Sequence, residues 1–165
     1  MIHIKPAINY SDFKQIETLA DTIWREHYIP IVGKLQIDYM LGKYQSAKAI
    51  KTQIENGFEY FVLHLDNTAV GYISIQAEQE VLFLSKIYVL KHYRRKKIAT
   101  QALVFIEEKA KSYQLKSIRL TVNKHNTEAI KTYEQFGFKY IRPLVTDIGN
   151  GFVMDDYEMG KQISH

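Results

Sequence analysis

Two adjacent segments decide the fold, Val81-Leu82-Phe83-Leu84-Ser85-Lys86-Ile87-Tyr88-Val89-Leu90 and Tyr93-Arg94-Arg95-Lys96-Lys97-Ile98-Ala99. The first is apolar on both faces for most of its length, which predicts a central strand covered on both sides. After the basic turn, apolar residues recur at helical spacing from Ile98 to about Tyr113, which predicts a helix. A helix start carries free backbone N–H groups and roughly half a positive charge, so this arrangement predicts a site for a polyanion.

The helix is expected to connect two parallel strands. The next strand is predicted at Ser117–Val122, so residues 82–122 predict a βαβ crossover at the centre of a mixed α/β sheet. Asp66 and Asn67 are expected to form the tight turn of a hairpin before this crossover. The other strands are expected at Ile2–Ile4, Phe58–Leu65, Ala69–Gln76, Phe138–Leu144 and Gly151–Met159.

Helices are predicted between the first strand and the hairpin. Ser11 and Asp12 are expected to be N-caps of a helix that runs to about His27, and Tyr28–Gly33 breaks its pattern. Its expected buried face consists of Phe13, Ile16, Leu19, Ala20, Ile23 and Trp24. Two shorter helices are expected near Leu35–Leu41 and Ser46–Glu55.

The composition indicates a globular protein and limits the classes to which it can belong. The chain has 165 residues, of which 46% are hydrophobic and 24% charged, and this predicts one domain over residues 1–165. No apolar stretch approaches the roughly 20 residues of a membrane helix, and the N-terminus lacks the apolar segment of a secretory signal. Cysteine is absent, so we expect no disulfide and no thiolate metal site, assign no metal, and expect a cytoplasmic protein.

The net charge of +4 is a mild excess. It suits phosphate-bearing partners and does not by itself indicate nucleic acid. A nucleic-acid-binding module that uses Lys91–Lys97 is an alternative, but no RNA-recognition or helix-turn-helix signature accompanies this run. The 12 tyrosines and 8 phenylalanines are explained by core packing or, alternatively, by a binding cleft lined with tyrosine.

A second motif follows the crossover, Asn126-Thr127-Glu128-Ala129-Ile130-Lys131-Thr132-Tyr133-Glu134-Gln135-Phe136-Gly137-Phe138. Asn126 is the expected N-cap of a helix, and Gly137 is expected to end it in the left-handed conformation. Asn126 and Tyr133 are seven residues apart, which is two helical turns, so both are expected on the same side. Taken alone, Asn126 is also explained as an ordinary helix cap, and Tyr133 as an ordinary tyrosine that packs on a helix face.

Together, the two motifs resemble the GNAT superfamily of acyl-CoA-dependent N-acetyltransferases. That family has a strand ending in a hydrophobic-Tyr-Val step, which Ile87-Tyr88-Val89 matches. A pyrophosphate turn of the form Arg/Gln-x-x-Gly-x-Gly/Ala follows, and here it begins at Arg94 and ends at Ala99. The family's later Asn-x-x-Ala-x-x-x-Tyr-Glu-x-x-Gly-Phe segment is matched at every position by residues 126–138.

The basic turn departs from the family pattern. Lys97 stands where this pattern has glycine, and the neighbouring position 95 carries Arg95, also without the freedom of glycine, which lets a phosphate approach the backbone closely. The resemblance otherwise extends to the whole chain in element order. It implies a central, mostly antiparallel mixed sheet with a splayed parallel βαβ crossover and helices on both faces.

The resemblance also implies acetyl-CoA as co-substrate and a set of coenzyme-binding residues. The backbone of Ile87, Tyr88 and Val89 is expected to pair with the pantetheine arm. The pyrophosphate is expected to bind Arg94, Arg95, Lys96, Lys97, Ile98, Ala99 and Thr100. Asn126 is expected to hydrogen-bond the pantetheine arm, and Tyr133 to contact the coenzyme and protonate the leaving thiolate as general acid.

The acceptor is expected to be a primary amine of a polyamine-like small molecule or a peptide, which attacks directly in a ternary complex. The residues expected to line its pocket are Trp24, His27, Tyr28 and Tyr88, with Asp155 attracting a cation. An alkyl ammonium with a pKa near 10.4 must lose a proton before it attacks. Glu78, Glu80 and His27 are candidate bases, and Glu78 is the one we assign. The alternative to a catalytic base is that Glu78 and Glu80 are ordinary charges on the solvated surface.

A catalytically silent acyl-CoA-binding or regulatory domain is the alternative function, because the expected glycines are missing from the turn. Either reading predicts no nucleic acid and no membrane as partner. A homodimer is compatible with both.

Overall fold

The structure is a computed structural model, and it describes residues 2–164. The chain forms two compact units, one of residues up to Ile75 together with Lys86–Ala102 and the other of Gln76–Ser85 together with residues from Leu103 onwards. The hydrogen-bonded strand order is β1-β2-β3-β4-β5-β7-β6, so β4, which belongs to both units, is the central strand as predicted.

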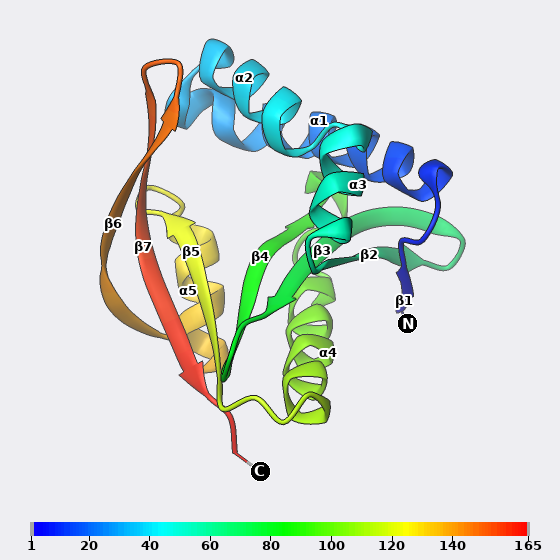
Figure 1. The fold of residues 1–165 in the computed structure, drawn as a ribbon, viewed down its shortest axis with the longest axis vertical. Helices are drawn as coiled ribbons and strands as arrows, with labels where there is room; N and C mark the ends of the chain where they lie inside the picture. The colour runs from blue at the N-terminus through cyan, green and yellow to red at the C-terminus, as the bar shows by residue number, and fades with distance from the viewer. Residues whose placement is uncertain (1, 165) are drawn as a thin grey trace. The chain divides into compact units, whose positions relative to one another are not determined.

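The first unit contains one edge of the sheet and three helices (Figure 1). Strand β1 pairs antiparallel with β2, with Ile2 opposite Leu65. Helix α1 packs on α2 and α3, and α3 packs on β2. The elements are β1 (Ile2–Pro6), α1 (Tyr10–Val32), α2 (Lys34–Tyr44), α3 (Ala47–Glu55), β2 (Phe58–Leu65), most of β3 (Thr68–Ala77), the second half of β4 (Val81–Val89), the short 3₁₀ helix η1 (Lys91–Tyr93) and the first turn of α4 (Ile98–Ser112).

Helix α1 is longer than predicted at both ends. The cap is Asn9, whose Oδ1 accepts from the backbone N–H of Asp12 at 3.0 Å, while the Asp12 carboxylate accepts from the Asn9 N–H at 3.2 Å. The prediction of Ser11 and Asp12 as N-caps was therefore wrong, because Asp12 is the third residue of a capping box. The six residues of its predicted apolar face are all buried.

The predicted end of α1 at His27 was also wrong, because the helix continues through Pro30 to Val32. Proline removes one N–H donor from the helical ladder. The ladder resumes beyond it, where Gly33 donates to the Ile29 carbonyl at 2.9 Å.

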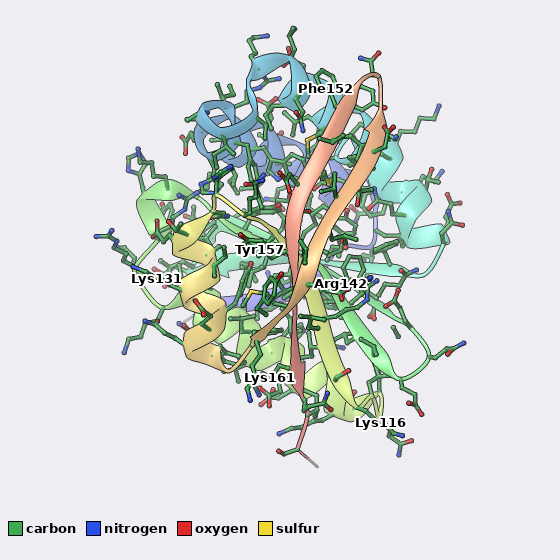
Figure 2. The ribbon with its side chains drawn as sticks, turned by 90° about the vertical axis from the view of Figure 1, so that its left-hand side faces the viewer. Lys116, Lys131, Arg142, Phe152, Tyr157 and Lys161 are labelled. Atoms are coloured by element: carbon green, nitrogen blue, oxygen red, sulfur yellow. The ribbon has the colours of Figure 1, made fainter. Side chains whose placement is uncertain are left out.

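The second unit contains the parallel strand pair, the C-terminal hairpin and helix α5 (Figure 1). Figure 2 shows Phe152 at the tip of the hairpin of β6 and β7, Lys161 far from that tip, and Lys131 on α5. The elements are the first half of β4 (Val81–Val89), most of α4 (Ile98–Ser112), β5 (Ser117–Asn123), α5 (Thr127–Phe136), β6 (Lys139–Gly149) and β7 (Phe152–Gln162).

The predicted crossover is confirmed, since β4 and β5 are parallel, with Val81 opposite Ser117 and Leu84 opposite Leu120. The element order and the mixed, mostly antiparallel sheet are confirmed as well. The splay of the two strands beyond this register stays a prediction. No helix within residues 2–164 is long and apolar enough to cross a membrane.

The two faces of β4 are covered differently, which the sequence did not predict. Leu82 and Leu84 are fully buried, whereas Phe83 on the opposite face is only half-buried. The guanidinium carbon of Arg119 lies 4.1 Å from the centre of the Phe83 ring. A cation therefore covers the Phe83 ring, on the face opposite Leu82 and Leu84.

The Asn9 cap generates a testable prediction. Asn9→Ala should lower the free energy of unfolding by about 1 kcal/mol, because it leaves a first-turn N–H without its acceptor. Ser11→Ala is the matched control and should change that free energy by less than about 0.5 kcal/mol. Urea unfolding followed by circular dichroism measures both, and a larger loss in the Ser11 variant would restore Ser11 as the cap.

Candidate functional site

The basic turn lies between the end of β4 and the start of α4, in the first unit. A short 3₁₀ helix, η1 (Lys91–Tyr93), follows the strand, and Arg94 then has an extended backbone, with φ −72° and ψ 161°. The Arg94 Nε donates to the Val89 carbonyl at 3.2 Å, which ties the turn back to the end of the strand.

Arg95 and Lys97 both adopt positive φ, 63° and 60°. This is the left-handed region that glycine enters freely and that costs an L-residue roughly 1–2 kcal/mol. The turn thus keeps a glycine-like backbone at Lys97, where the pattern has glycine, and at Arg95 two residues before it. Alternation of left-handed and ordinary residues turns successive N–H groups toward one anion, in an arrangement called a nest.

The first turn of α4 adds further backbone donors. The Lys97 carbonyl accepts from the Gln101 N–H at 3.0 Å, so the helical ladder starts at Lys97. The N–H groups of Ile98, Ala99 and Thr100 precede this first donor and have no partner within the helix. Backbone N–H groups from several consecutive residues are therefore available to oxygens of one polyanion.

The cationic side chains of the turn are not neutralised by carboxylates. Arg95, Lys96 and Lys97 are exposed. None of the three takes part in a side-chain hydrogen bond, ion pair or ring contact with another described residue. No shared carboxylate therefore offsets their charge within residues 2–164.

The end of β4, before the basic turn, lies unusually close to the backbone of β3. The Leu90 N–H donates to the Val70 carbonyl at 2.8 Å, which pairs β4 with β3. A Cβ atom at Gly71 would collide with the Tyr88 carbonyl oxygen and lie 3.1 Å from the Val89 Cα. Glycine at position 71 is therefore required to place Tyr88, and no local sequence signal indicates this role.

The structure brings together the four aromatic residues predicted to line an acceptor pocket, and all four lie in the first unit. The Tyr28 and Tyr88 hydroxyls are 3.2 Å apart, and the Tyr88 ring lies 5.5 Å from that of Trp24. The His27 ring lies 4.7 Å from that of Tyr28. Trp24 is 2% exposed and therefore packs in the core, whereas Tyr28 and Tyr88 are half-buried.

A buried polar network under this cluster was missed by sequence reasoning. The Tyr72 hydroxyl donates to Gln45 Oε1 at 2.5 Å, and Gln45 Nε2 donates to the Tyr60 hydroxyl at 3.0 Å. Burial raises the pKa of Tyr60 to about 12 and that of Tyr72 well above its usual value. Both phenols therefore stay neutral at ordinary pH, and neither serves as a base.

Asn126 and Tyr133 lie on α5 in the second unit. Asn126 caps the helix as predicted, with its Oδ1 accepting from the Ala129 N–H at 3.3 Å. Both side chains are largely buried, at 8% and 9% exposure, and the Tyr133 ring packs edge-on against Phe138 with 5.8 Å between centroids. Gly137 ends the helix with φ 110°, which confirms the left-handed stop.

The carboxylates predicted for acceptor chemistry have cationic partners within the second unit. Arg119 donates from Nε to Glu78 Oε1 at 2.8 Å and from a terminal nitrogen to Oε2 at 3.0 Å. Glu80 pairs with Lys116 at 3.1 Å. Asp155 lies within β7 and forms an ion pair with Lys124. Their charges are therefore compensated inside the unit.

The model of the acetyltransferase (GNAT) family matches residues 16–138, and the chain belongs to this family. It is 34% identical over 103 residues to an N-alpha-acetyltransferase of Saccharolobus solfataricus, covering 54% of this chain and 62% of that protein. It is 36% identical over 74 residues to the uncharacterized N-acetyltransferase YycN of Bacillus subtilis, covering 42% and 47%. The alignments thus span about half to three-fifths of these relatives.

Solved structures share the fold. The PaiA N-acetyltransferase of Thermoplasma acidophilum, in complex with coenzyme A, matches with a TM-score of 0.80 at 21% identity, over 98% of this chain and 99% of that one. The ribosomal-protein-S18-alanine N-acetyltransferase of Escherichia coli matches with a TM-score of 0.74 at 17% identity, over 100% and 96%.

Gly71 provides a test of the strand-end geometry. Gly71→Ala should lower the free energy of unfolding by about 1–3 kcal/mol, because the added methyl group displaces the Tyr88 carbonyl. Gly42→Ala is the control, since position 42 is an exposed helical site with open space around its Cα, and it should raise the same free energy by about 0.5–1 kcal/mol. Equal effects in urea unfolding would contradict the close approach.

Proposed function

We propose that the chain is an acetyl-CoA-dependent N-acetyltransferase that acetylates a primary amine of a small molecule or a peptide. The observation that carries the proposal is the left-handed backbone of Arg95 and Lys97. A family turn without its glycines keeps the conformation that presents backbone N–H groups to a pyrophosphate. We also propose that the protein works in the cytoplasm.

The donor set fits a pyrophosphate. Residues Arg94–Thr100 combine backbone N–H groups with four cationic side chains, and a hydrogen bond to a charged group contributes roughly 1.5–3 kcal/mol. The backbone of Ile87, Tyr88 and Val89 would pair with the amide-bearing pantetheine arm. In the second unit, Asn126 uses Oδ1 for the cap and keeps its Nδ2 group to donate to that arm.

Tyr133 is the proposed general acid. When bound, acetyl-CoA supplies an acetyl group on a thioester whose thiol has a free pKa of roughly 8.5. The Tyr133 phenol would hold a proton at its oxygen and deliver it to the departing sulfur. Its burial against Phe138 fixes the ring orientation that such a transfer needs.

The acceptor must arrive as a free amine. At pH 7, an alkyl ammonium with a pKa near 10.4 is deprotonated in about one molecule in 2,500. Glu78 was assigned as the base, but Arg119 already donates to both of its carboxylate oxygens. We therefore propose that Glu78 orders the second unit, and that ordered water carries the amine proton away.

The half-buried rings of Tyr28 and Tyr88 support a cationic acceptor, because aromatic faces attract ammonium groups. His27 beside Tyr28 is proposed to line the same surface. The proposed role of Asp155 is weaker, because Lys124 compensates its charge. No observation on the described residues favours the catalytically silent alternative.

The role of Tyr133 is tested by Tyr133→Phe. The variant should lower kcat by about 100-fold, because the acid is lost, while the Kd for coenzyme A changes less than about twofold. Tyr113→Phe, at a more exposed tyrosine, is the control and should leave kcat unchanged. Steady-state kinetics across pH and calorimetry measure these quantities, and an unchanged pH–rate profile would remove Tyr133 from the acid role.

The acceptor class is tested with a panel of a polyamine, a peptide with a free α-amine, and neutral and anionic amines. Cationic amines should react best. Tyr28→Leu should raise their KM by about two- to fivefold, while Tyr28→Phe, which keeps the ring, should change it less. Reaction with neutral or anionic amines alone would exclude the cationic acceptor. If the protein binds the coenzyme but acetylates no amine of the panel, the catalytically silent domain would be favoured.

A further inference from the structure

We infer that Gln45 is a positioning residue, which acts through Tyr72 to hold the Tyr88 ring in the place where it meets the acceptor amine. The inference rests on the proposed function, because it takes Tyr88 as part of the acceptor surface. Gln45 lies at the C-terminal end of α2 and Tyr72 lies within β3, and both belong to the first unit, as Tyr88 does. Two buried side chains would thereby influence an acceptor that neither of them touches.

The side-chain amide of Gln45 is buried and fully hydrogen-bonded. Gln45 is 1% exposed, and its Nε2 group donates to the Tyr44 carbonyl at 2.5 Å and to the Tyr60 hydroxyl at 3.0 Å. A carbonyl can only accept, so the amide nitrogen must face Tyr44 and the amide oxygen must face Tyr72. The Tyr72 hydroxyl therefore has to donate, and it does so to Oε1 at 2.5 Å. One orientation of the amide thus fixes the direction of the Tyr72 O–H group.

A second amide completes this network from α3. The Tyr60 hydroxyl donates to Gln53 Oε1 at 2.5 Å, and Gln53 Nε2 donates to the same Tyr44 carbonyl at 2.7 Å. In the described part of the chain, no hydrogen bond joins Gln53 to Tyr72. Gln53 therefore supports the network without binding the ring that lies next to Tyr88.

The Tyr72 ring carries the constraint to Tyr88. Tyr72 is fully buried, and its ring centre lies 5.6 Å from that of Tyr88, while the Tyr60 ring stacks on it at 6.3 Å. Gly71, the residue before Tyr72, lies against the Tyr88 carbonyl, so the backbone and the ring of Tyr88 meet consecutive residues of β3. A close-packed ring that is also hydrogen-bonded at its far end resists displacement. It therefore limits where the half-buried Tyr88 ring can lie.

The polar character of the network favours a positioning role. Two phenols and two amides fill space that apolar side chains of similar shape could fill at nearly the same stability. A buried network with its groups satisfied specifies a single arrangement, whereas an apolar core tolerates repacking. This fixed arrangement lies one ring away from the proposed acceptor surface. Its expected contribution is therefore affinity for the acceptor, through the placement of Tyr88.

The test compares Gln45→Leu, Tyr72→Phe, the double variant and Gln53→Leu. The first two remove the hydrogen bond between Gln45 and Tyr72 from either side and keep an apolar side chain of similar size. Gln53→Leu is the matched control, because it removes two hydrogen bonds of the same network and leaves that one intact.

Three measurements are made on each variant after thermal unfolding has shown that it is folded. Steady-state kinetics with the cationic amine that reacts best give KM and kcat, and calorimetry gives the Kd for coenzyme A. NMR spectra of protein with ¹³C-labelled tyrosine report the Tyr88 ring directly, and the signal is assigned by its loss in Tyr88→Phe.

We expect Gln45→Leu and Tyr72→Phe to raise the KM of the amine about fivefold and to change kcat and the coenzyme Kd less than about twofold, because only acceptor binding is weakened. The double variant should have the KM of the single variants, since all three lack the same bond. The Tyr88 signal should move or broaden in all three. Gln53→Leu should lower Tm by a similar amount and leave KM and the Tyr88 signal as in wild type.

An unchanged KM or an unmoved Tyr88 signal in Tyr72→Phe would overturn the inference, and this variant decides the matter if Gln45→Leu does not fold. An equal rise of KM in Gln53→Leu would also overturn it, because general loosening of the core would then explain the effect. If wild type binds no coenzyme A and acetylates no amine, the proposed function fails, and the Tyr88 signal still decides whether Gln45 positions the ring.

Discussion

The proposed chemistry depends on a backbone constraint at the start of α4. Arg95 and Lys97 adopt left-handed conformations that are unfavourable for residues with a side chain. The Lys97 carbonyl accepts the first hydrogen bond of the helix that follows, from the Gln101 N–H. These conformations decide where the N–H groups of the turn point, and therefore whether the loop binds an anion. The Arg94 contact with the Val89 carbonyl joins this turn to the strand before it. A change in the strand end would thus be transmitted to the N–H groups.

The strand end has its own constraint, which lies in a neighbouring strand. Gly71 lets the Tyr88 carbonyl approach β3 more closely than any Cβ would allow. The Tyr88 hydroxyl also lies within hydrogen-bonding distance of Tyr28 on α1. The residue proposed to pair with the coenzyme is thereby fixed by its backbone on one side and by its side chain on another. This is the preorganisation that a site for group transfer requires.

Local chemistry explains what the sequence predicted correctly. The Asn126 cap, the Gly137 stop and the buried stripe of α1 each depend on residues within a few positions of one another. The N-cap of α1 was misplaced because Ser11 and Asn9 are both good caps, and the choice depends on the reciprocal bond from Asp12. The segment around Pro30 was predicted to end the helix because proline has no N–H to donate. The sequence does not show that helical hydrogen bonding continues beyond it, where the Gly33 N–H donates to the Ile29 carbonyl.

Non-local contacts explain what the sequence could not predict. Glu78 is 41 positions from Arg119, and no periodicity links them. Asp155 pairs with Lys124 only because β7 runs antiparallel beside β5, and a strand register was needed to see it. In the sequence neither Glu78 nor Asp155 has an evident partner, whereas in the fold each forms an ion pair with a basic residue. The role of Gly71 is hidden for the same reason, since the backbone that it accommodates lies in another strand.

The distribution of paired charges separates structural from functional groups in this chain. In the second unit, Glu158 is 9% exposed and lies between Arg119 and Arg142, at 3.6 and 3.1 Å, and Lys161 pairs with Glu107 at 3.1 Å. Such pairs satisfy one another, because a buried charge without a partner is costly. The cations of the basic turn have no such partners among the described residues, and they stand on a backbone that is itself strained. A polyanion would neutralise these charges, and this supports the proposal that the turn holds the coenzyme.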